Sequence, residues 1–321
     1  MSKWKKYLLG GVLTVFAVVA AGAGWFFYGI FHRVEGKYFD SNGVQIHYTD
    51  EGAGDPVILI HGFAAQADAN WRPGGVTGLL AKHHRVIALD NRGHGLSGKP
   101  HDPAMYGNEM VEDIPRLMDH LKIPRAHIVG YSMGAFITLK LLTTHPERFI
   151  TATIGGAGYL PPTEEDRKLF EDLAKSLESG EGYRPLFVRL TPIGKPVDER
   201  RIRSFNRMLA WANDELAIAA VARSFAQFVA DEEKIKTITV PVLQVCGTTD
   251  PLRVGVENLS SLLTGEEMVW VEGGDHISTV RRPELREAIE RFIDEHPLAD
   301  VAAAVPVAPA ALHATTGAAA R

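Results

Sequence analysis

The pentapeptide Gly130-Tyr131-Ser132-Met133-Gly134 follows an apolar, strand-like run at residues 126–130 and opens a helix-like run at residues 133–144. A serine at a sharp strand-to-helix turn presents its hydroxyl to a cleft, and the flanking glycines avoid clashes between a Cβ atom and the neighbouring strand and helix. The pentapeptide alone is a weak signal. Its place between a strand and a helix predicts that Ser132 is a nucleophile.

Strand-like and helix-like segments alternate on both sides of this turn. Continuous apolar runs, typical of strands covered on both faces, occur at residues 56–60, 85–89, 126–130, 149–154, 240–247 and 268–271. Residues 44–49 alternate apolar and polar side chains, like an antiparallel edge strand. Helical spacing occurs at residues 108–121, 133–145 and 285–293. We therefore predict an α/β fold with a mostly parallel twisted sheet flanked by helices.

One long interval, residues 158–236, contains no convincing strand. Its helical patterns are rich in charge and cover residues 164–179, 183–190, 200–213 and 216–231. A helical insertion of this length between two strands predicts a cap over the active edge of the sheet, because reactive groups gather at the carboxyl ends of parallel strands.

Composition excludes several classes of function. The chain has 321 residues, a formal net charge of -5 and no block of basic residues in its body, which argues against a nucleic-acid partner. The single cysteine, Cys246, cannot form an internal disulfide or a cysteine-based metal site, and its apolar surroundings predict a buried side chain. We expect neither a metal nor a cofactor.

The N-terminus resembles a membrane-targeting segment. Lys3, Lys5 and Lys6 precede the uncharged residues 7–31, which as a helix would cross a hydrocarbon core. The alternative is a secretory signal cleaved at Ala21-Gly22-Ala23. Because aromatic side chains at the end of the run resemble an interfacial belt, we predict an uncleaved signal anchor. The lysines predict a cytoplasmic N-terminus and a periplasmic or extracellular catalytic domain, or a secreted protein if the signal is cleaved.

The C-terminal residues are mostly Ala, Val and Pro with little charge, which predicts a segment without fixed structure. The predicted organisation is a signal anchor (1–33), the first part of the core (34–157), a helical cap (158–236), the second part of the core (237–297) and a low-complexity tail (298–321).

A serine nucleophile needs a base and an acid that orients the base. Asp250 follows the run at residues 240–247, and His276 follows the run at residues 268–271. The order Ser132, Asp250, His276 is the one expected with a strand-to-helix serine turn. Asp275 is the nearest rival acid, but adjacent residues rarely orient each other, so we interpret it as a turn-capping group.

The oxyanion that forms during acyl transfer needs two hydrogen-bond donors. The backbone N–H of Met133, directly after the nucleophile, is one candidate. The other is the N–H of Phe63, in the loop His61-Gly62-Phe63 after the strand at residues 56–60. His61 resembles a catalytic base, but we predict that it braces this loop by hydrogen bonding.

These segments together resemble the α/β-hydrolase superfamily. The resemblance rests on the loop at residues 61–63, the segment Asp90-Asn91-Arg92-Gly93-His94-Gly95-Leu96-Ser97, the Ser132 turn, residues 247–251 and Gly274-Asp275-His276. It implies a Ser132–His276–Asp250 triad and no cofactor. Relatives that open epoxides or remove halides place an aspartate where this chain has Ser132, so the resemblance implies acyl transfer. The segment at residues 90–97 resembles a structural loop of the family.

We expect a serine hydrolase that cleaves carboxylic esters of small to medium acyl chain, tethered to the membrane by its N-terminal helix. The alternatives are a carbon–carbon bond hydrolase or cofactor-free perhydrolase of the same fold, and a non-catalytic binding protein. The predicted substrate contacts are Trp71, Tyr131, Leu186, Phe187 and Trp211.

Overall fold

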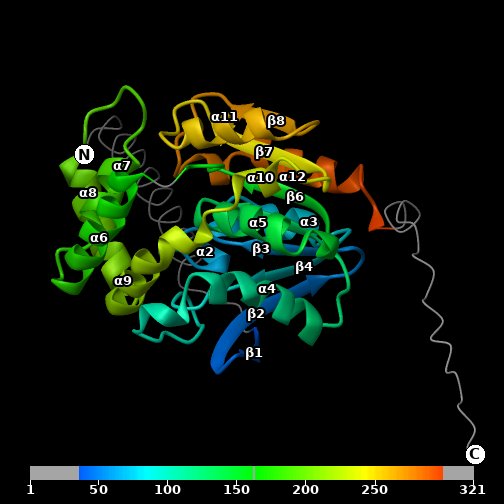
Figure 1. The fold of residues 1–321 in the computed structure, drawn as a ribbon, viewed down its shortest axis with the longest axis horizontal. Coiled ribbons are helices and arrows are strands. Elements are labelled where there is room, and N and C mark those ends of the chain that lie inside the picture. Colours follow the sequence, from blue (N-terminus) through cyan, green and yellow to red (C-terminus); the bar gives the residue numbers. More distant parts are fainter. Residues whose placement is uncertain (1–35, 162, 299–321) are drawn as a thin grey trace, which may run out of the picture.

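The computed structural model describes residues 36–161 and 163–298, and its centre is a twisted eight-stranded sheet (Figure 1). In spatial order the strands are β1 (Lys37–Ser41), β2 (Val44–Gly52), β4 (Arg85–Leu89), β3 (Pro56–Ile60), β5 (Ala126–Tyr131), β6 (Phe149–Gly155), β7 (Val242–Gly247) and β8 (Glu267–Val271). The pairs β1–β2 and β2–β4 are antiparallel, and every other pair is parallel. The predicted fold class is confirmed.

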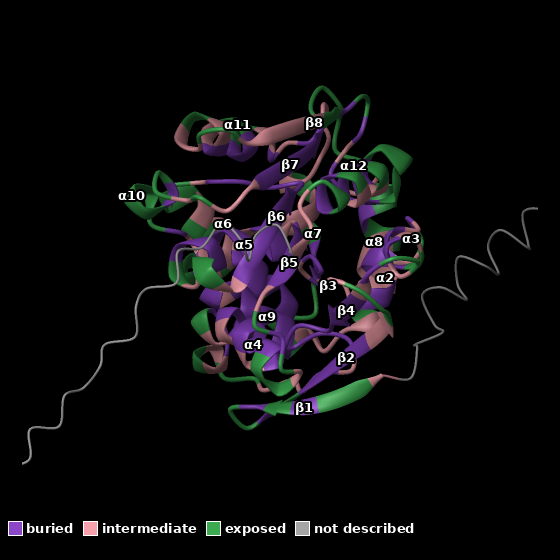
Figure 2. Cartoon of the chain, turned by 90° about the vertical axis from the view of Figure 1, so that its right-hand side faces the viewer, coloured by how far each residue is buried: buried purple, intermediate pink, exposed green. Residues whose placement is uncertain are grey.

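Both faces of the sheet are covered, which explains the continuous apolar runs. In β3, the side chains of Ile58 and Ile60 join the apolar cluster on one face, and those of Val57 and Leu59 join the cluster on the other. The first face is covered by α4 (Asn108–His120), α5 (Met133–Thr144) and α11 (Arg253–Leu262), and the second by α2 (Ala67–Trp71), α3 (Val76–Leu80) and α12 (Pro283–Asp294). Figure 2 shows the buried central strands between partly exposed helices.

The first hairpin corrects one sequence expectation. Residues 44–49 do form an antiparallel strand, β2, but the edge of the sheet is β1, which the sequence patterns missed. The turn between them is Asn42-Gly43, and both residues have positive φ, 55° and 82°. Asn-Gly is a strong signal for a two-residue hairpin, so this dipeptide could have predicted the strand β1 before it.

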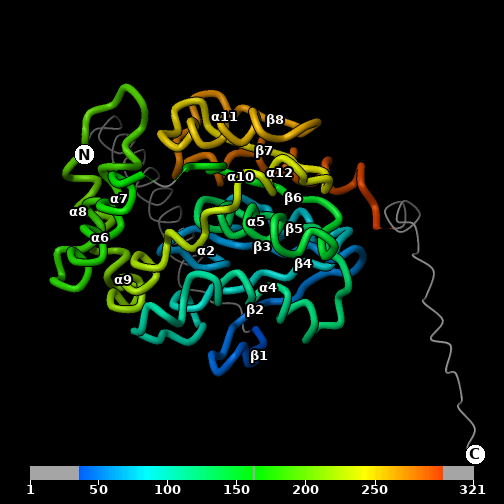
Figure 3. The backbone as a smooth tube through the Cα atoms, in the orientation of Figure 1, coloured from blue at the N-terminus to red at the C-terminus, as the bar shows by residue number. Residues whose placement is uncertain are grey.

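Between β6 and β7 the described residues form helices and no strand. The helices are α6 (Glu164–Glu178), α7 (Arg184–Arg189), α8 (Glu199–Ala212), α9 (Glu215–Ser224) and the short α10 (Glu232–Ile235). Side chains of Thr163, Asp198 and Asp214 accept backbone N–H groups at the starts of α6, α8 and α9. The chain leaves the sheet after β6, builds α6 to α9 at one side and returns to β7 (Figure 3).

The predicted anchor (1–33) and almost all of the predicted tail lie outside the described residues. Within residues 36–161 and 163–298, no helix combines the length and the apolar character that a membrane span requires. Cys246 in β7 is fully buried, as its apolar surroundings predicted.

Candidate functional site

Ser132 lies at the turn between β5 and α5 and has left-handed backbone geometry, with φ 56° and ψ −116°. This is uncommon for a residue other than glycine and is held here by the surrounding sheet. A Cβ atom on Gly130 would lie 2.1 Å from the carbonyl oxygen of Gly134, and one on Gly134 would lie 2.1 Å from that of Ile60. Both glycines are therefore required for α5 to pack directly onto the sheet.

The three predicted polar side chains meet at the carboxyl ends of β5, β7 and β8. His276 Nε2 is 2.9 Å from Ser132 Oγ, and His276 Nδ1 is 2.8 Å from Asp250 Oδ2. Asp250 and His276 are both buried. A carboxylate at Nδ1 fixes the tautomer with its proton on Nδ1, which leaves Nε2 free to accept the serine proton.

Asp275, the rival acid, has a different role. Its Oδ1 accepts hydrogen bonds from the N–H groups of Ile277 (3.0 Å) and Ser278 (2.6 Å), so it caps the turn that follows His276. Asp250 Oδ1 accepts the N–H of Leu252 at 2.8 Å, which leaves Oδ2 for the histidine.

The loop after β3 passes close to the nucleophile. A Cβ atom on Gly62 would lie 3.2 Å from Ser132 Cβ. Along this loop the N–H of Gly62 donates to Asn70 Oδ1, that of Ala64 to His94 Nε2 and that of Ala65 to the Gly62 carbonyl. Within the described residues, the N–H of Phe63 has no such acceptor.

Two buried histidines, His61 and His94, hold this loop by hydrogen bonds. His61 Nε2 accepts the N–H of Asn91 at 2.9 Å, and its Nδ1 donates to the Gly62 carbonyl at 2.8 Å. His61 therefore braces the loop, as its position after β3 predicted. Burial lowers the pKa of His61 and lowers that of His94 to about 3, so both rings stay neutral.

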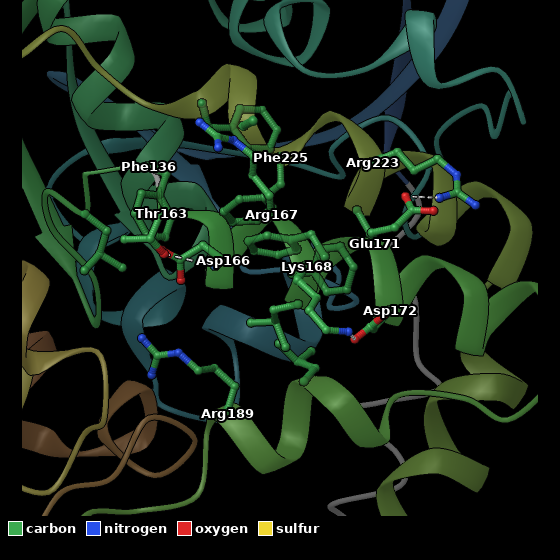
Figure 4. A pocket seen from close by; sticks show the side chains of 18 of the residues that line it. Phe136, Thr163, Asp166, Arg167, Lys168, Glu171, Asp172, Arg189, Arg223 and Phe225 are labelled. Atoms are coloured by element: carbon green, nitrogen blue, oxygen red, sulfur yellow. Dashed lines mark hydrogen bonds and ion pairs between the residues drawn. The ribbon is translucent and has the colours of Figure 1, made fainter.

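Ser132 lines two cavities. The larger has a volume of about 650 Å³ and lies under α6, α7 and η3 (Phe225–Phe228), and the smaller, about 270 Å³, lies between α8 and the loop after β3. Phe63, Leu186 and Leu190 line both cavities beside the serine. Figure 4 shows Phe136 and Phe225 at the larger cavity, with charged side chains of α6 around it. The cavities give the nucleophile two mostly apolar spaces.

The predicted substrate contacts divide into two groups. Leu186 and Phe187 line the cavities, and Tyr131 lines the smaller one. The predictions for Trp71 and Trp211 are wrong. Trp71 is 1% exposed because α2 turns it into the core between the sheet and α12, and Trp211 is 69% exposed on α8 and lines neither cavity.

The charges around the larger cavity are mostly paired. Four of its cationic side chains have acidic partners within 4 Å, namely Arg167, Lys168, Lys175 and Arg223. Arg189, at the end of α7, has no acidic partner among the described residues, and its guanidinium donates only to the Pro251 carbonyl at 3.4 Å. Arg189 was not among the predicted site residues, because no motif surrounds it in the sequence.

Known proteins resemble this chain over most of its length. The family model described as alpha/beta hydrolase fold matches residues 55–191. The 2-hydroxy-6-oxo-6-(2'-aminophenyl)hexa-2,4-dienoic acid hydrolase of Metapseudomonas resinovorans is 30% identical over 77% of this chain and 87% of its own length. A putative non-heme chloroperoxidase of Synechocystis sp. is 25% identical over 74% of this chain and 90% of its own.

Among solved structures, the enol-lactonase from Burkholderia xenovorans has a TM-score of 0.66 at 22% identity and covers 81% of this chain and 99% of its own. That likeness concerns the fold. Together with the family match and the relative that shares 30% identity, it leads to one conclusion: the chain belongs to the α/β-hydrolase family.

Proposed function

We propose that this protein is a serine hydrolase that cleaves the carbon–carbon bond beside a ketone in a substrate that also carries a carboxylate. The observation that carries the proposal is the position of Arg189. Its guanidinium lines the cavity that contains Ser132 and has no acidic partner among the described residues. A partly buried cation that lines the same cavity as a nucleophile favours an anionic substrate. The relative from Metapseudomonas resinovorans, named as a hydrolase of a keto-dienoic acid, supports the same substrate class.

The triad geometry supports a stepwise reaction. Ser132 Oγ attacks the ketone carbon while His276 Nε2 takes its proton, and Asp250 stabilises the imidazolium that forms. The N–H groups of Phe63 and Met133 stabilise the oxyanion. The carbon–carbon bond then breaks, and the departing carbanion, delocalised over the conjugated substrate, takes the proton from His276. Water attacks the acyl group with His276 as base, which releases a carboxylic acid and restores Ser132.

Hydrolysis of carboxylic esters of small to medium acyl chain is the second candidate. It is favoured by the N–H of Phe63, which has no acceptor among the described residues and belongs to the loop that passes Ser132, since an ester carbonyl passes through the same tetrahedral oxyanion. An ester needs no delocalised leaving group, and a neutral ester needs no contact with Arg189. The two candidates therefore differ in their dependence on that arginine.

The test uses purified full-length protein with 2-hydroxy-6-oxo-6-phenylhexa-2,4-dienoate and, in parallel, p-nitrophenyl butyrate. We expect release of benzoate from the dienoate with the higher kcat/KM, and loss of both activities in Ser132→Ala. Arg189→Gln should raise KM for the dienoate about 10- to 100-fold, the range of a charge-assisted hydrogen bond, and leave KM for the ester unchanged.

Arg184→Gln is the matched control. Arg184 lies on the same short helix but pairs with Glu199 on the exposed surface, so its loss should change neither KM. Ester turnover without dienoate cleavage would favour the second candidate. Equal KM values for the dienoate in Arg189→Gln and wild type would show that Arg189 does not bind the substrate carboxylate.

A further inference from the structure

Ala64, directly after Phe63, has a left-handed backbone conformation. Its φ is 54°, an uncommon value for a residue with a Cβ atom. Such a conformation persists only where surrounding groups hold it. The Phe63 N–H lies in the peptide group one residue before the two that flank Ala64, so the backbone held at Ala64 restrains the chain next to that N–H.

Two side chains from different parts of the fold hold Ala64. His94 Nε2 accepts the Ala64 N–H at 3.1 Å, and His94 Nδ1 donates to the Arg92 carbonyl at 3.0 Å. Asn213 Nδ2, from the helical insertion, donates to the Ala64 carbonyl at 3.2 Å. The N–H and the carbonyl of this one residue are therefore both fixed by side chains distant in sequence.

Asn213 belongs to the helical insertion and not to the sheet. It is the C-cap residue of α8, and its Nδ2 also donates to the Leu209 carbonyl at 3.1 Å, which ties the side chain to the last turn of the helix. Leu209 lines the smaller cavity. The same helix end thus contacts the loop that contains Phe63 and forms part of the wall around the substrate space.

We propose that Asn213 is a positioning residue for the oxyanion hole: by binding the Ala64 carbonyl, it aligns the Phe63 N–H when the insertion is docked on the sheet. The proposal rests on the serine-hydrolase chemistry proposed above, because only an oxyanion gives the Phe63 N–H a catalytic use. Asn213 itself touches no reacting atom. Asn213 also lines the smaller cavity, but its loss should lower turnover more than binding, since the hole stabilises charge that appears only in the transition state.

The test compares Asn213→Ala and the isosteric Asn213→Asp with Asn206→Ala, using the purified full-length protein and p-nitrophenyl butyrate. Asn206 is the matched control. It also lies on α8 and also makes two side-chain hydrogen bonds, to the Tyr183 N–H at 2.9 Å and the Glu181 carbonyl at 3.2 Å, but both partners lie within the insertion. We expect both Asn213 variants to lose about 10- to 100-fold in kcat with KM within threefold of wild type. Asn206→Ala should keep wild-type kcat.

Thermal unfolding of all variants separates positioning from folding, because Asn213→Ala and Asn206→Ala each remove two hydrogen bonds to backbone groups and should shift Tm by similar amounts. A second readout is the rate at which a fluorophosphonate probe labels Ser132, which should fall with kcat. If the Asn213 variants match Asn206→Ala in kcat and labelling, the positioning role is overturned while the serine-hydrolase function stands. If wild-type Ser132 is neither labelled nor required for turnover, both proposals are overturned.

Discussion

The Tyr131 hydroxyl donates a 2.8 Å hydrogen bond to the backbone carbonyl of His276. Tyr131 ends β5 directly before Ser132, so this bond joins the strand that carries the nucleophile to the loop that carries the base. The two rings also pack at a centroid distance of 5.6 Å. Burial raises the pKa of Tyr131 well above its usual value, so the phenol stays a donor throughout the neutral range.

We therefore predict that Tyr131→Phe lowers kcat severalfold and leaves KM near the wild-type value. The ring remains, but the His276 loop loses one anchoring hydrogen bond, worth about 1 kcal/mol. Steady-state kinetics and urea unfolding measure the two effects. Tyr159→Phe is the control, because its hydroxyl bonds Glu232 at 3.2 Å, away from the triad. A kcat for Tyr131→Phe equal to that of the control would contradict a role in placing His276.

The meeting of Ser132, Asp250 and His276 could be predicted because it depends on topology. Each residue follows a continuous apolar run, such runs form the parallel strands of a covered sheet, and the carboxyl ends of parallel strands share one edge. Gly130 and Gly134 were also informative, because a side chain at either position would clash with the backbone where α5 packs against the sheet. Local pattern and global fold agree at these positions.

The contacts made by the helical insertion could not be predicted in the same way. Trp71 and Trp211 are large aromatic residues near the predicted site, yet one faces the core and the other faces solvent. Helical spacing identifies an apolar face but does not state which neighbour that face meets. Arg189 and Asn213 depend on how α7 and α8 dock, and no local pattern marks either residue.

Leu186 should control the size of group that the site accepts. It lies on α7 and lines both cavities beside Ser132. We predict that Leu186→Trp lowers kcat/KM about tenfold for the 6-phenyl dienoate and leaves p-nitrophenyl acetate within threefold, because a larger side chain takes space that only the bulkier substrate needs. Val188→Trp, on the exposed side of the same helix, should change neither value. Equal losses for both substrates would contradict this assignment.

A buried ion pair ties the first hairpin to the body of the fold. Arg92 is fully buried and binds Asp113 through Nε (2.7 Å) and Nη2 (2.5 Å), while Ser41 Oγ donates to the same carboxylate at 2.5 Å. Asp113→Ala leaves the buried guanidinium with only the Glu109 carboxylate at 3.7 Å and the carbonyls of Met105 and Ser41, so we predict a loss of about 3 kcal/mol in the free energy of unfolding. Urea unfolding measures this loss.

Asp119→Ala is the comparison for that measurement. Asp119 pairs with Arg148 at 2.8 Å, but its side chain is 69% exposed, so its removal should cost less than about 1 kcal/mol. A loss for Asp113→Ala as small as that for Asp119→Ala would show that Arg92 finds other partners or water.

Two buried histidines should make the fold sensitive to acid. Burial lowers the pKa of His94 to about 3 and that of His127 to about 4. Below roughly pH 6.5 the unfolded chain binds a proton at each position that the folded protein does not, so stability falls with pH by roughly 1.4 kcal/mol per unit for each histidine. This loss continues until the pH reaches the lowered pKa of each group.

The variant His127→Asn removes one of these two titrating side chains. Its destabilisation relative to wild type at pH 8 measures lost packing and the lost hydrogen bond to Thr151 Oγ1. Between pH 8 and pH 5 this difference should shrink by about 2 kcal/mol in urea unfolding, because the variant no longer takes up the proton on unfolding. A difference that stays constant from pH 8 to pH 5 would contradict the buried neutral state of His127.

We propose that residues 7–31 anchor the protein in a membrane, with the sheet domain on the side opposite the N-terminal lysines. Their uncharged, apolar sequence is long enough to cross the hydrocarbon core. Full-length protein should therefore remain in the membrane pellet after an alkaline carbonate wash. In Val18→Arg/Val19→Arg each arginine near the centre of the run costs about 2.5–3.5 kcal/mol of insertion, so that variant should move to the supernatant. Release of the intact wild-type protein by carbonate, or a mature N-terminus near Gly24, would contradict the anchor.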